Sequence, residues 1–391
     1  MPRFRPFRAL RYAADDLAAV VAPPYDVLDA DDVAALAARS AHNVVRVDVP
    51  TQDEDGYRRS AELLARWRRE GVLVADPRPS FTLYRMRFSD HTGAARDLVG
   101  VLGGLEVVDE GAGGVLPHER TTPKASTDRL DLTRATAANL SPVWGLSLAT
   151  GLTALLREPG EPLGSVEEDG VRHLVERVDD PDRVAAIAAV VAADDVLVAD
   201  GHHRYAISRT YRDEVRAATG RRDTRAEETL AFVSELVPEQ LSVAAIHRLY
   251  DDVTPAALRA ALERWFVLEP APRPDPGTLA AMQREGFLVL LEGGAAWRLR
   301  PRPGAFDGVR ALDGAWLETA LAGSPAAVRY QHGLAETLAA VESGTAAAAV
   351  LIRPVGITEI ERTAREGLLM PPKSTFFTPK LKTGLVVRPL G

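Results

Sequence analysis

Five consecutive residues near the middle of the chain have side chains that suit phosphate chemistry: Asp200, Gly201, His202, His203 and Arg204. They follow an apolar run that resembles a strand. A glycine turn there would present backbone N–H groups at the N-terminus of the next helix, where the partial positive charge favours an anion. The imidazoles and the guanidinium would add donors, and a guanidinium can hold two phosphate oxygens at once. We therefore predict that residues 201–204 bind phosphate, and that Asp200 holds Mg²⁺ or orients a histidine.

A structural interpretation of the same segment is that Asp200 caps a helix and that both histidines lie on the surface. Capping would need only one Asp or Ser and gives no reason for the run His-His-Arg, so we favour the phosphate site, with Asp200 and His202 as candidate catalytic groups. Zinc is not expected here, because neighbouring residues on a helix point apart.

A second polar cluster, residues 116–124, contains two prolines and combines one acid, one histidine and two cations within seven residues. Glu119 could act as a general base or bind a substrate amine, and His118 could bind the substrate. Arg120 and Lys124 suit phosphate. A solvated charged loop explains this segment equally well.

Two proline-flanked segments near the chain ends carry further candidates. Lys373, Ser374 and Thr375 would lie in an extended loop where they could bind substrate; the alternative is an edge strand with a polar turn. Asp26 is a candidate catalytic carboxylate beside Tyr25, although a structural turn is the interpretation that this segment favours by itself. Because the four segments share carboxylates, cations and hydroxyls, we predict that they converge around one anionic ligand.

The elements that must position these groups alternate between strand-like and helix-like patterns, which is typical of an α/β or α+β fold. Residues 81–88 and 98–108 predict two antiparallel strands, so the sheets should be mixed. Residues 196–199 predict a buried strand, and a helix should follow from Gly201. Further expected elements are a strand over residues 44–49, a helix over 56–70 that Gly71 ends, and a helix from Asp180 and Pro181 to about Ala193.

The length of 391 residues suggests two or three domains, which we expect at residues 1–155, 156–255 and 256–391. Four prolines within residues 269–277 indicate a linker or a long loop, since proline removes backbone donors and favours extended chain.

Composition narrows the range of partners. A net charge of -8 disfavours binding to nucleic acid or an anionic membrane but allows one local basic pocket. The lack of cysteine excludes disulfide scaffolds and thiol nucleophiles, and no apolar run is long enough to span a membrane. The first residues do not resemble a signal peptide. We expect a soluble, cytoplasmic protein that binds small molecules, and leave a homo-oligomer open.

Four segments in this order resemble the family called domain of unknown function 1015. They are PPYDV from residue 23, HERT from 118 with DRL from 128, ADGHHRY from 199, and MPPKSTFFTPKL from 370. The resemblance covers about residues 4–387. It departs from the expected pattern at Ile246, where a threonine would precede His247.

The ADGHHR segment is also similar to the signature of the ParB/sulfiredoxin-like superfamily, which includes nucleotide-dependent free-serine kinases, sulfiredoxins and ParB partition proteins. The resemblance implies a nucleotide-binding core of that type in residues 156–255, with Gly201, His202, His203 and Arg204 on the nucleotide phosphates. In the serine kinases an acid N-terminal to this segment acts in catalysis, which implies Glu119 as the base, with Asp26 as the alternate.

These observations predict a nucleotide-dependent phosphotransferase that uses ATP or ADP, with Mg²⁺, to phosphorylate a small hydroxyl compound such as free serine. One alternative is a phosphohydrolase of a small phosphomonoester such as phosphoserine, which would use the same anion site. Another is a nucleotide-binding regulatory or partition-type module, which the net charge and the lack of a basic recognition helix disfavour.

Overall fold

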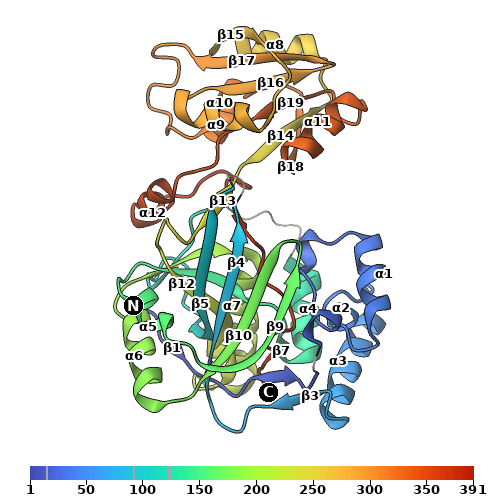
Figure 1. Cartoon of the computed structure of the whole chain (residues 1–391), viewed down its shortest axis with the longest axis vertical. Helices are drawn as coiled ribbons and strands as arrows, with labels where there is room; N and C mark the ends of the chain where they lie inside the picture. Colours follow the sequence, from blue (N-terminus) through green and yellow to red (C-terminus); the bar gives the residue numbers. More distant parts are fainter. Residues whose placement is uncertain (15, 91–92, 121–125) are drawn as a thin grey trace. The chain divides into compact units, whose positions relative to one another are not determined.

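The computed structural model describes residues 1–14, 16–90, 93–120 and 126–391, and the chain divides into two compact units (Figure 1). Unit 1 comprises Met1–Ser242 and Pro379–Gly391, and unit 2 comprises Val243–Thr378. Both chain ends therefore belong to unit 1.

Unit 1 is built, in the part of the chain that the structure describes, on a nine-stranded sheet in the order β6-β11-β8-β12-β5-β4-β10-β9, with β1 beside β5. Its pairs β4–β5 and β5–β12 are antiparallel, whereas β8–β12 and β6–β11 are parallel. The expected mixed sheet of an α/β fold is therefore confirmed. The strands are β1 Phe4–Arg5, β4 Phe81–Ser89, β5 Ala95–Glu106, β6 Val115–Leu116, β8 Val143–Ser147, β9 Glu161–Glu168, β10 Val171–Val178, β11 Val196–Asp200 and β12 Glu228–Glu235.

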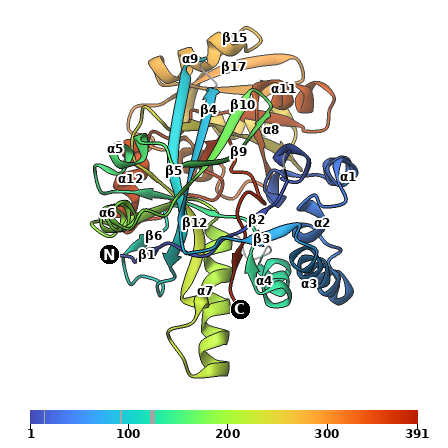
Figure 2. The same ribbon diagram turned by 60° about the horizontal axis from the view of Figure 1, so that its bottom comes forward.

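In both views α5 and α6 lie together on one side of unit 1 and α1, α2 and α3 on the other, with the long helix α7 between them (Figures 1 and 2). The α-helices are α1 Ala30–Arg39, α2 Val45–Asp48, α3 Glu54–Arg69, α4 Ser126–Thr136, α5 Leu152–Arg157, α6 Pro181–Val191 and α7 His202–Thr219. Short 3-10 helices cover Leu17–Ala19, Tyr25–Val27 and Arg225–Glu227, and two small antiparallel pairs join β2 Leu10–Tyr12 to β3 Leu73–Ala75 and β7 Ala138–Asn139 to β21 Arg388–Pro389.

Several local predictions are confirmed. The strands expected at 81–88 and 98–108 form the antiparallel pair β4–β5. Helix α6 begins as expected, since the Asp180 carboxylate accepts a hydrogen bond of 2.9 Å from the backbone N–H of Arg183. The run before Asp200 is the buried strand β11, and α7 follows it at His202.

The strand predicted for residues 44–49 is wrong, because most of this segment forms the short helix α2. The Asn43 side chain explains the difference. Its Oδ1 accepts a hydrogen bond of 3.0 Å from the backbone N–H of Val45, and its Nδ2 donates to the carbonyl of Val21 at 3.1 Å. Such side-chain bonds to the backbone start a helix even where β-branched residues favour a strand.

Unit 2 contains, within the described residues, a six-stranded antiparallel sheet in the order β15-β17-β16-β19-β14-β18. Leu288 and Leu290 belong to one apolar cluster, and Val289 and Leu291 to another, so the period-2 alternation of β16 buries both faces of the sheet. Strand β13, Ser242–Ala244, begins at the last residue of the first segment of unit 1. The other elements are β14 Ile246–Asp251, α8 Pro255–Glu263, β15 Phe266–Ala271, α9 Pro276–Glu285, β16 Leu288–Glu292, β17 Ala295–Pro301, α10 Asp313–Ala320, β18 Ala327–His332, α11 Leu334–Glu342, β19 Ala348–Leu351, α12 Ile357–Arg365 and β20 Phe376–Thr378.

The linker predicted at residues 269–277 is wrong, since this segment lies inside unit 2. Pro270 is in β15, the terminal strand of the sheet, where a missing N–H can be tolerated. Pro276 starts α9, and Asp275 caps that helix. The two compact units meet in sequence at Ser242 and Val243, and strands from both sides of residue 156 share the large sheet. The three-domain division stays a prediction.

No helix within the described ranges is long and apolar enough to cross a membrane.

Candidate functional site

The turn between β11 and α7 has the geometry of an anion site. Gly201 has φ +86°, in the left-handed region that favours glycine, and no side chain caps the start of α7. The first N–H groups of this helix therefore have no side-chain acceptor at the cap, and no acidic residue occupies its first turn. The predicted strand, turn and helix all lie where the sequence placed them.

Asp200, the last residue of β11, is held between two cations. Its Oδ1 lies 3.4 Å from Lys380 Nζ, and its Oδ2 accepts a hydrogen bond of 3.0 Å from Arg204 Nη2. Burial by itself raises the pKa of Asp200, but Lys380 and Arg204 outweigh burial and bring the net pKa below its ordinary value. Asp200 is therefore an ionised carboxylate that orients two cations.

Arg204 lies in the first turn of α7, with its guanidinium folded back over Gly201. A Cβ at Gly201 would lie 3.0 Å from Arg204 Nε. Besides Asp200, the guanidinium donates through Nη1 to the carbonyl of Pro142. The side chain is 10% exposed. Arg204 thus joins the end of β11 to the segment before β8, a structural contact that the sequence did not indicate.

Two histidines from different motifs meet beside this turn. The rings of His118 and His202 are 4.8 Å apart with an interplanar angle of 62°. His118 Nδ1 donates to the carbonyl of Val198 at 2.7 Å, which leaves Nε2 as the unprotonated nitrogen of the neutral ring. Burial lowers the pKa of His118 to about 4 and, together with His118, lowers the pKa of His202 well below its ordinary value. Both imidazoles are therefore neutral at pH 7.

His202 Nε2 is buried and has no hydrogen-bond partner among the residues that the structure describes. Leaving such a group unpaired costs about 1–3 kcal/mol. A ligand oxygen at the start of α7 would give this nitrogen a partner.

Arg129, from the Asp-Arg-Leu segment in α4, connects the N-terminal motif to the same region. Its guanidinium lies 4.2 Å from the centroid of the Tyr25 ring, and its Nη1 donates to the backbone oxygen of Asp48 at 2.5 Å and to Asp48 Oδ1 at 3.3 Å. Its Nε donates to Asp128 at 2.8 Å, and Tyr57 donates to the same carboxylate at 2.7 Å. Burial raises the pKa of Asp48, although Arg129 and Arg204 oppose this effect.

A cavity of about 50 Å³ lies between these groups. Tyr25, Asp48, Arg129 and Arg204 provide its charged and aromatic lining. The other lining residues are Leu132, Thr133, Ala138, Asn139, Leu140, Ser141, Ile207, Ser208 and Thr229. We call this space the Arg129 cavity.

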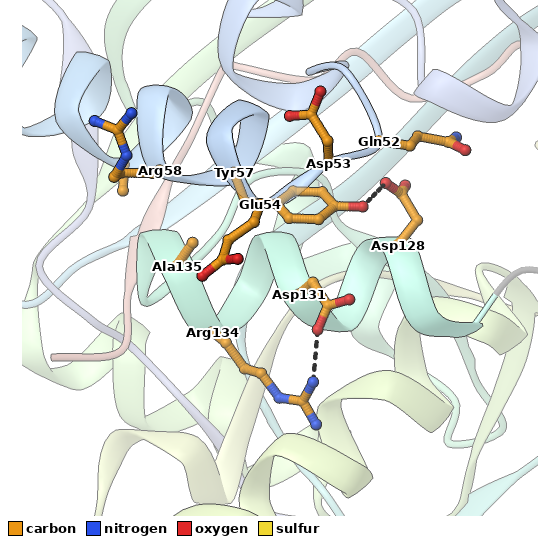
Figure 3. Close-up of a pocket in the computed structure, with 10 residues that line it drawn as sticks. Gln52, Asp53, Glu54, Tyr57, Arg58, Asp128, Asp131, Arg134 and Ala135 are labelled. Carbon is orange, nitrogen blue, oxygen red and sulfur yellow. Dashed lines mark hydrogen bonds and ion pairs between the residues drawn. The ribbon is translucent and has the colours of Figure 1, made fainter.

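A much larger open pocket, of about 920 Å³, lies along α3 and α4 (Figure 3). Tyr57 and Asp128 meet across it, and Asp131 pairs with Arg134 along α4. None of the predicted site residues lines it, so pocket size alone does not locate the site.

The remaining predicted residues of unit 1 are placed as follows. Glu119 is partly buried and directly follows His118 in the chain, whereas Arg120 and Asp26 are exposed. His203 is partly buried in the first turn of α7. Lys124 lies outside the described residues.

The predicted substrate-binding residues Lys373, Ser374 and Thr375 belong to unit 2. Lys373 is exposed with φ +58°, and the buried Ser374 hydroxyl donates to the carbonyl of Pro371 at 2.8 Å. Their approach to the turn at Gly201 stays a prediction. The same motif continues into unit 1, where Lys380 reaches Asp200.

Four groups of this region were not assigned a role from the sequence. Tyr25, Arg129 and Lys380 each lie in a quoted motif, so the motifs themselves were the available signal. Asp48 carried no such signal, because its segment resembled a strand.

A protein-held Mg²⁺ does not fit Asp200 in this arrangement. Both carboxylate oxygens face cations, and no group of three or more His, Asp or Glu side chains within the described ranges could hold a metal ion. We therefore assign no step to a metal bound by the protein.

Comparison with known proteins identifies the family but no close relative. The family model described as "Protein of unknown function (DUF1015)" matches residues 4–315. No curated protein matches the chain.

Solved structures show distant likeness. A free serine kinase in complex with AMP is 12% identical with a TM-score of 0.38, over 70% of this chain and 89% of that one. SbnI with a C-terminal truncation, from Staphylococcus aureus, is 14% identical with a TM-score of 0.40, over 73% and 87%. A conserved hypothetical protein from Pyrococcus furiosus is 12% identical with a TM-score of 0.38, over 70% and 92%.

Proposed function

The chain belongs to the DUF1015 family, and from the site that its motifs build we propose that it is a nucleotide-dependent phosphotransferase acting on a small hydroxyl compound such as free serine. The nucleotide phosphates would bind at the start of α7, and the acceptor hydroxyl would attack the terminal phosphorus.

The observation that carries this proposal is the unpartnered His202 Nε2 at the uncapped start of α7. A phosphate oxygen there would accept from the backbone N–H groups and from the imidazole together. Because His118 and His202 are neutral at pH 7, they would act as hydrogen-bond donors or acceptors rather than as cations.

The charges around the turn between β11 and α7 support phosphate binding because two cations share one carboxylate. Lys380 and Arg204 share the single carboxylate of Asp200, so these three groups carry one net positive charge. An arriving phosphate can compete for either cation without leaving Asp200 unpaired. In phosphoryl transfer, positioning and charge neutralisation of this kind account for most of the catalysis.

In the proposed reaction the acceptor oxygen forms a bond to phosphorus while the bond between phosphorus and the nucleotide oxygen breaks. Glu119 would accept the hydroxyl proton, with Asp26 as the alternate base. Mg²⁺ would arrive on the nucleotide and neutralise its phosphates, whereas Asp200 would keep its two cationic partners, Lys380 and Arg204.

Phosphorus NMR of the purified protein tests this function directly. The protein is incubated with ATP or ADP, with and without Mg²⁺, and with a panel of small alcohols that includes serine. A new phosphoester signal that needs both nucleotide and acceptor is the expected result. Orthophosphate formed without dependence on an acceptor would indicate a phosphohydrolase instead, and bound but unchanged nucleotide would indicate a regulatory module.

A variant links the activity to the site. His202→Ala should lower turnover at least tenfold, because it removes the donor at the start of α7. The exposed His332→Ala in unit 2 is the control and should turn over like the unaltered protein. Equal activity in both variants would contradict the placement of the phosphates.

A further inference from the structure

We propose that the Arg129 cavity binds a small zwitterion, an α-amino acid that carries a hydroxyl group, and that it is the acceptor site. The binding of such an amino acid is inferred from the cavity itself, whereas its role as acceptor rests on the proposed function.

The size of the cavity limits the ligand. A water molecule needs on the order of 10–15 Å³ of this kind of volume, so 50 Å³ holds about three to five waters. That space suits a compound of only a few non-hydrogen atoms and is too small for a nucleotide. The cavity and the start of α7 would therefore bind different ligands, with Arg204 lining one and lying beside the other.

Buried charged groups in the cavity keep unused hydrogen-bonding capacity. The side chains of Asp48 and Arg129 are only 4% and 9% exposed. Asp48 Oδ1 and Arg129 Nη1 pair with each other, whereas none of the hydrogen bonds of these two side chains to described residues uses Asp48 Oδ2 or Arg129 Nη2. Neither atom belongs to the fully enclosed unpaired groups of the described residues, so both are open to a ligand that enters the cavity and would pair with it there.

The signs of the charges select a zwitterion. Arg129 Nη2 can donate to a carboxylate, and Asp48 Oδ2 can accept from an ammonium group. A plain anion would meet the Asp48 carboxylate, and a plain cation would meet two guanidinium groups. Hydroxyl donors and acceptors on Ser141, Ser208 and Thr229 complete a polar lining suited to a hydroxyl-bearing side chain.

The surrounding contacts hold Arg129 in place without a ligand. Tyr25 packs against one face of its guanidinium, and Asp128 accepts from its Nε. Tyr57 in turn fixes Asp128. A guanidinium held on several sides loses little conformational freedom on binding, which favours affinity for a small ligand.

Calorimetric titration with L-serine tests the site. Saturating AMP is present throughout, because AMP has no phosphoanhydride to transfer. L-Serine should bind at least tenfold more tightly than glycolate, which lacks the ammonium group, and than ethanolamine, which lacks the carboxylate. Equal affinities across this panel, or no binding of L-serine at millimolar concentration, would overturn the proposal without any variant.

Asp48→Asn should weaken L-serine binding at least tenfold, since it removes the charge that faces the ammonium group. Asp76→Asn is the matched control. Asp76 is also 4% exposed and pairs with Arg11, itself 9% exposed, but it does not line the cavity. Equal weakening in both variants would mean that loss of any buried ion pair explains the effect, and would overturn the site.

The same variants separate this inference from the proposed function. If L-serine binds and Asp48→Asn weakens its binding but no phosphoester ever forms, the amino-acid site is supported and the proposed phosphotransferase activity is refuted. If phosphoserine forms and Asp48→Asn leaves the KM for L-serine unchanged, the phosphotransferase activity is supported and the proposed amino-acid site is refuted.

Discussion

At the scale of single residues, the site depends on charged and neutral groups that sit side by side. Asp200 stays ionised between Lys380 and Arg204, whereas the neighbouring residue His202 and His118, whose rings are 4.8 Å apart, stay neutral. Burial explains the neutral imidazoles, and paired cations explain the ionised carboxylate. This difference in charge state between Asp200 and the two histidines predicts how the stability of the protein should respond to pH and to substitution.

Buried neutral histidines should make the protein less stable as the pH falls. The pKa of His118 is 6.5 in the unfolded chain and about 4 in the folded protein. Between these values the unfolded state binds more protons, so the stabilisation is complete above pH 6.5 and is lost as the pH falls towards 4. The difference corresponds to roughly 3 kcal/mol.

Urea unfolding between pH 7 and pH 4.5 measures this effect. The variant His118→Asn should show a clearly smaller loss of stability over that range than the unaltered protein. His173, whose pKa burial also lowers to about 4, should give a similar result as His173→Asn. Parallel curves for the protein and its variants would show that these imidazoles are not buried neutral.

Arg204→Lys keeps the positive charge but loses the planar guanidinium group with its several N–H donors. Lysine has one terminal nitrogen and cannot reach both Asp200 and the carbonyl of Pro142, so one buried partner loses its hydrogen bond. We expect a loss of about 1–3 kcal/mol in stability. Turnover should also fall about tenfold or more, if the remaining N–H groups hold two phosphate oxygens as predicted.

Thermal unfolding and turnover are measured on one sample of this variant. Arg209→Lys is the control on the same helix. Arg209 pairs with the exposed Glu110 on the surface, so the stability of this variant should change by less than about 0.5 kcal/mol. Full activity in Arg204→Lys would refute the prediction that the Arg204 guanidinium binds two phosphate oxygens at once. Complete unfolding would make Arg204 a structural arginine.

At the scale of elements, the β11-turn-α7 segment forms the proposed phosphate site, and its geometry depends on two glycines. Gly201 starts α7 and Gly220 ends it, and both have positive φ. They differ in their surroundings: a Cβ at Gly201 would meet the Arg204 guanidinium, whereas a Cβ at Gly220 would have nothing within 4 Å.

This pair predicts unequal effects for the same substitution. Gly220→Ala should cost only the backbone strain of the left-handed region, about 1–2 kcal/mol. Gly201→Ala should cost that strain and also displace Arg204, so that stability falls further and turnover falls at least tenfold. Chemical unfolding and the phosphoester assay check both variants. If they behave alike, the contact between Gly201 and Arg204 has no role.

At the scale of the whole molecule, the last residues complete unit 1 after the chain has formed unit 2. Val387 exchanges two backbone hydrogen bonds with Leu10, of 2.9 and 3.0 Å, and Val386 is fully buried. Lys380 and Lys382 pair with Asp200 and Glu168. Residues from the end of the chain therefore support both the core and the site of unit 1.

A chain that ends at Thr378 should lose stability in unit 1 alone. We expect hydrogen exchange to speed up in β2 and in the large sheet, while the strands of unit 2 keep their protection because that unit has its own apolar clusters. A chain that ends at Leu390 is the control. Unchanged exchange in β2 after the longer truncation would show that the C-terminal segment only covers the surface.

The sequence by itself determined the local structure of the site. An apolar run followed by Asp-Gly-His-His-Arg can form little other than a buried strand, a glycine turn and a helix start, because each signal acts on its immediate neighbours. The mixed α/β class and the antiparallel pair β4–β5 followed from periodicity in the same way. The strand expected at 44–49 was wrong because the local pattern was overridden by a contact with a distant residue: the Asn43 side chain is held by the carbonyl of Val21 and starts a helix instead.

Only the tertiary structure decided which side chains face one another. The contacts of His118 with His202 and of Lys380 with Asp200 join residues that the sequence separates widely, and no periodicity encodes such pairs. The Arg129 cavity is a second example, since Asp48 and Arg129 come from different helices. Packing places these groups together because burial of a charge is tolerated only beside an opposite charge, and that condition depends on the folded chain as a whole.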